Sequence, residues 1–298
     1  MNSLPPRPLP QLDPSRIHCL DGAIGTELMR LGWSGDGSSD IWARNHPDIV
    51  LSMHARYVDA GAEIVTAATF GANRGRLAKA GGDGEIGALN QEMVGLARQA
   101  AGGRAYVAGC IGPTGWEAQF GIAHRAEAQA VFAEQAKALA TAGVDLITVE
   151  TMTSLTEALV AVRAVLTVCS TPIWVCLTFL EGGRLVDGSS AAEAVLSLTD
   201  LGVRAVGCNC MPPDDQLIQI VKSMAAVTSV PVVVRPSAGL SSIDSPPTGP
   251  QISPHDFAEF AVRLRKSGAG IIGGCCGIGP EHIAQLSQHS AHYREGLQ

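Results

Sequence analysis

Short apolar runs alternate with longer amphipathic stretches along most of the chain. Eight runs are nearly continuous in apolar residues, which is typical of parallel strands buried on both faces. They cover residues 17–20, 63–67, 105–109, 146–149, 173–177, 205–207, 231–234 and 270–272. Stretches with helical spacing lie between them, at residues 48–60, 126–142, 154–168, 191–201, 214–226 and 254–267. The alternation predicts repeated strand–helix units.

The number of these units favours a closed sheet. An open, doubly wound sheet is the alternative, but no glycine-rich dinucleotide-binding fingerprint follows the first strand. Eight strand–helix pairs instead predict an α/β fold, a single (β/α)8 TIM barrel. Glycines expected at the helix ends support this reading; they are Gly61, Gly143, Gly202 and Gly268. We assign residues 15–298 to the barrel and the proline-containing residues 1–14 to a flexible lead-in.

Composition narrows the class of protein. The 298 residues are 46% hydrophobic and 16% charged, which is enough apolar material for one large core. A formal net charge of -7 without runs of like charge argues against nucleic-acid binding. Apolar runs fall short of the roughly 18 residues needed to span a membrane, and the N-terminus lacks a secretory pattern. We expect a cytoplasmic protein that binds neither nucleic acid nor membrane and keeps its cysteines reduced.

Three cysteines follow predicted strands at the end where barrel enzymes place their chemistry. Cys210 ends the sixth strand, and Cys275 and Cys276 end the eighth, flanked by glycines. Adjacent side chains alternate in a strand, so both thiols face one point only if the backbone turns, which glycine permits. Three thiolates form a soft site that selects zinc. We predict a Zn²⁺ ion held by these three cysteines, with Cys208 as a less favoured substitute ligand and ordinary core cysteines as the alternative.

The charge of these ligands indicates the chemistry. Three thiolates nearly cancel the charge of the metal, which makes it a weak Lewis acid toward water. A substrate thiol bound there would be deprotonated and still able to attack carbon. The expected reaction is alkyl transfer to sulfur.

Other strand-end residues are candidates for substrate binding. Asp21 and Glu150 follow the first and fourth strands and can bind a substrate ammonium. A salt bridge to Arg235 and paired general acid–base catalysis are the alternatives. Three aromatic residues near predicted rim segments can face a cationic methyl donor, although ordinary packing is the alternative; they are Trp42, Phe70 and Trp116.

The strand-end segments resemble those of the zinc-dependent homocysteine S-methyltransferases, a family that includes betaine- and S-methylmethionine-dependent enzymes and the first module of cobalamin-dependent methionine synthase. The resemblance covers nearly the whole chain; it is carried by residues 21–28, 60–62, 69–73, 112–113, 150–151, 209–210, 273–277 and 280–283. It implies transfer of a methyl group to the thiol of homocysteine, which would take the open position on the zinc. The substrate-binding residues that we assign are Asp21, Gly22, Glu150, Phe70 and Trp42.

The methyl donor is less well specified. The resemblance implies an onium compound such as S-methylmethionine, betaine or S-adenosylmethionine, and a corrinoid donor would require a separate protein. Ser237 stands where relatives often carry Asn, and residues 240–253 lack an aromatic residue that relatives often place there. Two alternatives therefore stay open: methyl transfer to another thiol or a selenol, and a metal-free barrel with a redox-active pair at Cys275 and Cys276.

Overall fold

Eight parallel strands form the centre of the molecule in the computed structural model, which describes residues 12–13, 15–81, 85–116, 124–242, 245–248 and 251–295. The strands are β1 (His18–Cys19), β2 (Ile64–Thr66), β3 (Tyr106–Ile111), β4 (Leu146–Met152), β5 (Ile173–Leu177), β6 (Ala205–Asn209), β7 (Val232–Arg235) and β10 (Ala269–Ile272). Their order is β1-β10-β7-β6-β5-β4-β3-β2. A parallel bridge between Leu20 and Ile64 brings the two outer strands together, so the barrel closes as predicted.

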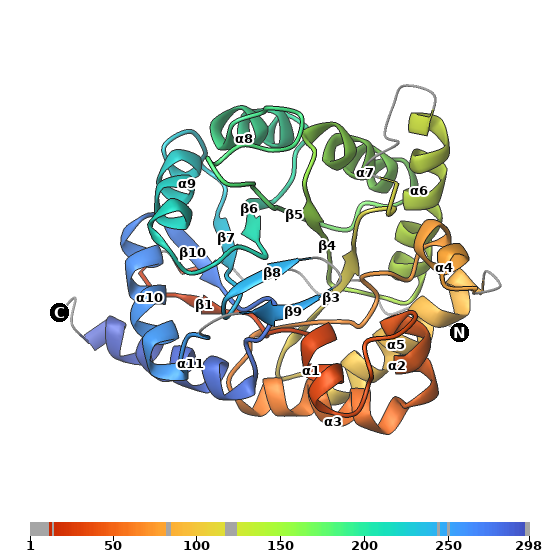
Figure 1. Cartoon of the computed structure of the whole chain (residues 1–298), viewed down its shortest axis with the longest axis horizontal. Coiled ribbons are helices and arrows are strands. Elements are labelled where there is room, and N and C mark those ends of the chain that lie inside the picture. The colour runs from red at the N-terminus through yellow and green to blue at the C-terminus, as the bar shows by residue number, and fades with distance from the viewer. Residues whose placement is uncertain are drawn as a thin grey trace.

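Helices surround this ring of strands (Figure 1). The six amphipathic stretches each contain a helix: α3 (Pro47–Asp59), α6 (Arg125–Thr141), α7 (Leu155–Val168), α8 (Ala191–Thr199), α9 (Asp215–Ala225) and α10 (Pro254–Lys266). Five further helices are α1 (Gly25–Arg30), α2 (Ser39–Asn45), α4 (Arg74–Lys79), α5 (Ile86–Ala101) and α11 (Pro280–Glu295). The four glycines expected at helix ends all have positive φ, between 79° and 110°, which side chains of other residues disfavour.

A short antiparallel hairpin interrupts the strand–helix pattern after β7. It pairs β8 (Leu240–Ser242) with β9 (Ser245–Thr248), and Figure 1 shows it across the centre of the ring. The sequence pattern did not predict these strands, because the segment is rich in serine and proline. The expected loss of substrate contacts from residues 240–253 falls largely outside the described side chains.

The core has two layers, as alternation along each strand requires. Inward-facing residues fill the barrel with Leu20, Ile64, Ala108, Leu146, Trp174, Cys176, Ala205, Val233 and Ile271. A larger apolar layer lies between the strands and the helices. From the proposed lead-in, Leu12 packs against the inner cluster and the Asp13 N–H donates to His18 Nε2 at 2.9 Å; residues 1–11 and 14 lie outside the described part. Within the described ranges, no helix is both long and apolar enough to cross a membrane.

Candidate metal centre and substrate cavity

A cavity of about 600 Å³ opens at the carboxyl ends of the strands. All three predicted metal ligands line it, and so do Gly22, Phe70 and Glu150. Other lining residues come from the strand ends and from the segments around α1, α2 and α4; they include Thr26, Trp33, Asp40, Thr66, Arg76, Lys79, Thr151 and Arg235. The structure therefore brings most of the predicted site residues to one place.

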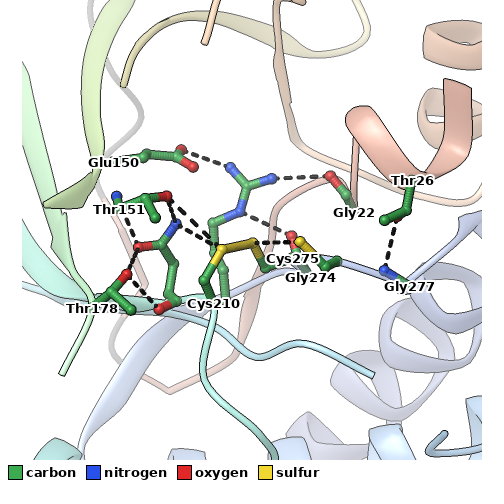
Figure 2. The surroundings of a disulfide bond; sticks show 12 residues. Gly22, Thr26, Glu150, Thr151, Thr178, Cys210, Gly274, Cys275 and Gly277 are labelled. Carbon is green, nitrogen blue, oxygen red and sulfur yellow. Dashed lines mark hydrogen bonds and ion pairs between the residues drawn. A yellow bond between two sulfur atoms is a disulfide. The ribbon is translucent and has the colours of Figure 1, made fainter. Parts of the chain in front are cut away.

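The three cysteine sulfurs converge. The Sγ atoms of Cys210, Cys275 and Cys276 all lie within 4.8 Å of one another, although the residues come from two strand ends. Cys210 and Cys275 form a disulfide in this structure (Figure 2), with their Cα atoms 5.5 Å apart. The Sγ of Cys276 lies 4.0 Å from that of Cys275. The pair that bonds is thus Cys210–Cys275, not the vicinal pair considered in the redox alternative.

An unusual backbone conformation aims Cys210 into the cavity. Cys208 is fully buried in the layer between strands and helices, and an extended strand would send Cys210 to the same side. Instead, Cys210 has a φ of 58° in the left-handed region. Thr151 has a φ of 61°, and these are the two non-glycine residues with positive φ in the part of the chain that the structure describes. Such strain collects at functional sites when surrounding contacts hold it in place.

Those contacts run through Asn209, which precedes Cys210. Its Nδ2 donates to Thr151 Oγ1 at 2.8 Å, and its Oδ1 accepts from the Thr151 N–H at 3.0 Å. Thr178 Oγ1 donates to the Asn209 carbonyl at 3.0 Å (Figure 2). The Sγ of Cys210 lies 3.7 Å from Asn209 Nδ2 and 3.8 Å from Thr151 Oγ1. The network holds two strained residues against each other and places polar hydrogens near the sulfur.

Two of the glycines beside Cys275 and Cys276 let the backbone pack closely against neighbouring residues. A Cβ on Gly273 would lie 2.5 Å from Leu20 Cβ, and one on Gly274 would lie 2.2 Å from Ile278 Cγ2. Gly277 turns the chain with a φ of 81° and donates its N–H to Thr26 Oγ1 at 2.9 Å. The predicted turn is therefore present, but only Gly277 among these three supplies it through a left-handed conformation.

Asp21 and Glu150 meet at Arg235. Arg235 Nη2 donates to Asp21 Oδ1 at 2.8 Å, and Nη1 donates to Glu150 Oε1 at 2.9 Å. All three side chains are at least nine-tenths buried. Burial raises the pKa of Asp21 to about 6, although Arg235 and hydrogen bonds from Thr66 act in the opposite direction. The salt bridge considered as an alternative is present, and it includes both carboxylates.

Phe70 and Trp42 lie differently. Phe70 lines the cavity, but the Arg76 guanidinium lies over its ring, 5.4 Å from the centroid. Trp42 stacks on His46 with ring centroids 3.9 Å apart and packs against the core. Trp33, and not Trp42, is the tryptophan among the described residues that line the cavity. No sequence signal distinguished Trp33 from the other tryptophans.

The other buried cysteines lie in the core, except Cys110, which lines the cavity. Burial raises the pKa of Cys208 to about 12, and it raises the pKa of Cys19 to about 12 as well. Cys110 and Cys176 are also buried, and burial raises the pKa of both thiols. A thiol that stays protonated is a poor nucleophile. Cys208 lies in the layer between strands and helices and therefore lacks the orientation of a substitute ligand.

Comparison with known proteins identifies the family. Residues 18–290 match the family model for homocysteine S-methyltransferase. The chain belongs to the homocysteine S-methyltransferase family. It is 28% identical over 299 residues to methionine synthase from Mycobacterium leprae and 28% identical over 297 residues to methionine synthase from Mycobacterium tuberculosis. Each match covers 94% of this chain and 25% of the relative, so the chain spans about a quarter of the length of these relatives.

Solved structures in this methyltransferase family extend the comparison. Homocysteine methyltransferase MmuM from Escherichia coli is 26% identical, and the match covers 92% of this chain and 96% of that chain. The TM-score is 0.77 for its metallated form and 0.79 for its oxidised form.

Proposed function

We propose that this chain transfers a methyl group to the thiol of homocysteine, with Cys210, Cys275 and Cys276 holding a zinc ion in their reduced form. The observation that carries the proposal is the convergence of three sulfurs, within 4.8 Å of one another, in the cavity. With zinc–sulfur bonds of about 2.3 Å, two sulfurs on one tetrahedral ion lie about 3.8 Å apart, close to the 4.0 Å between the Sγ atoms of Cys275 and Cys276. This spacing and the all-thiol donor set support a zinc site with three protein ligands once Cys210 and Cys275 are reduced.

The chemistry of such a site suits sulfur alkylation. Cys210, Cys275 and Cys276 would hold the zinc ion, which would supply one open position for a substrate thiol and favour its electron-rich thiolate form. The acceptor sulfur then forms a bond to the methyl carbon while the bond from that carbon to the donor breaks, and the donor leaves with the bonding electron pair. The thiol proton passes to solvent when the acceptor binds.

The residues of the chain position the reactants. Asn209 and Thr151 hold Cys210 in its strained conformation, so its sulfur stays directed into the cavity. Gly22 lines the cavity, and its carbonyl accepts a hydrogen bond from Arg235 Nη2. Glu150 faces the cavity and offers the acceptor a polar neighbour. Alignment of donor and acceptor at this mouth contributes to the rate by proximity.

The methyl donor would occupy the same cavity as the acceptor. Phe70 and Trp33 line that cavity, and S-methylmethionine, betaine and S-adenosylmethionine are the donors we propose to test first. The similarity to two methionine synthases makes a methylated corrinoid a further donor to test. Trp42 remains a candidate only if its stacked position against His46 changes when donor binds.

One observation favours a second function. The Cys210–Cys275 disulfide fits a metal-free, redox-active barrel, in which these two cysteines exchange two electrons and two protons with an external dithiol–disulfide couple. Metal content and turnover separate the two functions. Protein purified under reducing conditions without chelator should contain about one zinc per chain, as expected of a single three-cysteine site.

A methylation assay tests the proposed activity directly. Homocysteine is incubated with each of S-methylmethionine, S-adenosylmethionine, betaine and methylcobalamin, and methionine is measured. We expect methionine from at least one donor, and loss of methionine formation after removal of zinc. Full activity in metal-free protein would contradict the zinc proposal. Methylation only of another thiol or a selenol would show that homocysteine is not the acceptor.

A further inference from the structure

A guanidinium from the chain itself lies between the two carboxylates that were expected to bind a substrate ammonium. Arg235 uses all of its donors there. Its Nε donates to the Gly274 carbonyl at 3.1 Å, Nη1 to Thr66 Oγ1 and Glu150 Oε1, and Nη2 to Asp21 Oδ1 and the Gly22 carbonyl. Figure 2 shows the side of this cluster formed by Glu150, Gly22 and Gly274.

Asp21 is enclosed by protein. Its side chain has no exposed surface, and it is absent from the described residues that line the cavity. Oδ1 accepts from Thr66 Oγ1 at 3.0 Å and from Arg235, and Oδ2 accepts from the Thr66 N–H at 2.5 Å. Its role is to hold Arg235, and no face of the carboxylate is left for a substrate.

Glu150 reaches the cavity, but its charge is already matched. Oε1 accepts from Arg235 at 2.9 Å, and the side chain is 8% exposed. A substrate ammonium that approached Glu150 would also approach the Arg235 guanidinium, and the repulsion between the two cations would offset much of the attraction to the carboxylate. Glu150 alone is therefore a weak partner for an ammonium.

Sites reject a substrate that lacks a polar group mainly because their own buried polar groups are then left unpaired. Here Arg235 pairs Asp21 and Glu150 before any substrate binds. A thiol without an ammonium would leave nothing unsatisfied in this cluster.

We propose, on the basis of the function proposed above, that the acceptor site does not select for an α-amino group. Its acceptors are short aliphatic thiols, and homocysteine is one member of that class.

The test compares two acceptors on the unmodified, reduced and zinc-loaded protein. Homocysteine is compared with 4-sulfanylbutanoate, in which hydrogen replaces the amino group, and binding is measured by titration calorimetry beside the methylation assay. We expect dissociation constants and kcat/KM values within about tenfold of each other, well below the 10⁴–10⁵ rejection typical of a site built to pair a polar group. A preference of more than about a hundredfold for homocysteine would overturn the inference and leave the proposed function intact. Failure of both thiols to bind would overturn both proposals.

A conservative variant gives an independent reading. Glu150→Gln keeps an oxygen for Arg235 and removes the carboxylate charge that faces the cavity. We expect the ratio of the two dissociation constants to stay within about threefold of the unmodified protein, because the amino group makes no strong ion pair there. Weakening of homocysteine binding alone, by about tenfold or more, would show that Glu150 pairs with the ammonium and would overturn the inference.

Discussion

Removal of Arg235 tests the buried cluster that defines this site. Arg235, Asp21 and Glu150 are 4%, 0% and 8% exposed in their side chains, so Arg235→Met would leave two buried carboxylates without their cation. Breaking a buried ion pair by removing one partner costs about 3–5 kcal/mol. We expect a loss of this size in the free energy of unfolding, measured by urea denaturation with zinc and reductant held constant.

A surface arginine provides the matched control. Arg263 pairs with Asp215, but their side chains are 54% and 86% exposed. Exposed pairs contribute at most about 1 kcal/mol, so Arg263→Met should change stability little. If the two variants lose the same stability, the cluster around Arg235 is not a buried ion-pair network and the reasoning fails.

The stability lost in Arg235→Met should depend on pH through the protonation of Asp21. The folded-state pKa of Asp21 is raised from 3.8 to about 6, so the stability linked to its protonation is present below pH 3.8 and is lost as pH rises through about 6. Without Arg235 this pKa should rise further, because the cation that favours the carboxylate is gone. The variant should therefore lose less stability at about pH 5 than at about pH 8, because a protonated Asp21 needs no cation. Equal losses at both values would contradict the assignment.

Three further predictions concern the metal, the cavity wall and the amino end of the barrel. Cys210→Ser should lose both bound zinc and methyl transfer, whereas Cys208→Ala should keep its zinc; elemental analysis distinguishes them, and retained zinc in the first variant would remove Cys210 from the site. Gly22→Ala should destabilise the fold by about 1–3 kcal/mol because its Cβ would lie 2.2 Å from a backbone carbonyl oxygen, whereas Gly25→Ala meets nothing within 4 Å and should be neutral in thermal unfolding. Burial alone would raise the pKa of Glu63, but hydrogen bonds from neighbouring His, Arg and backbone groups lower it to about 2. Its contribution to stability is present above pH 4.5 and is lost as pH falls toward 2. At neutral pH the free energy of unfolding of Glu63→Gln should be about 1 kcal/mol lower than that of the unmodified protein, because the group is partly exposed. Acid denaturation should show this difference disappearing between pH 4.5 and 2.

Much of the barrel follows from the sequence pattern. Burial on both faces makes a parallel strand apolar along its length, so each of the eight runs marked a strand. Helix bounds agreed within a few residues because glycines such as Gly61 and Gly143 end helices by a local conformational preference. The hairpin of β8 and β9 was missed because its serine- and proline-rich residues carry no such pattern.

The sequence by itself also indicated the chemistry of Cys210, Cys275 and Cys276, because strand ends of a closed barrel must meet at one mouth. Tertiary structure decided how Cys210 reaches that mouth: regular alternation would direct it outward, and contacts with Asn209 and Thr151 hold the left-handed backbone that turns it inward.

Tertiary structure also decided which cation the carboxylates meet. Arg235 and Asp21 are 214 residues apart in the chain, and hydrophobic periodicity reports how deeply a residue is buried but not which distant side chain it meets. The sequence placed Asp21 and Glu150 at the mouth, and only the folded barrel showed that Arg235 had already paired them.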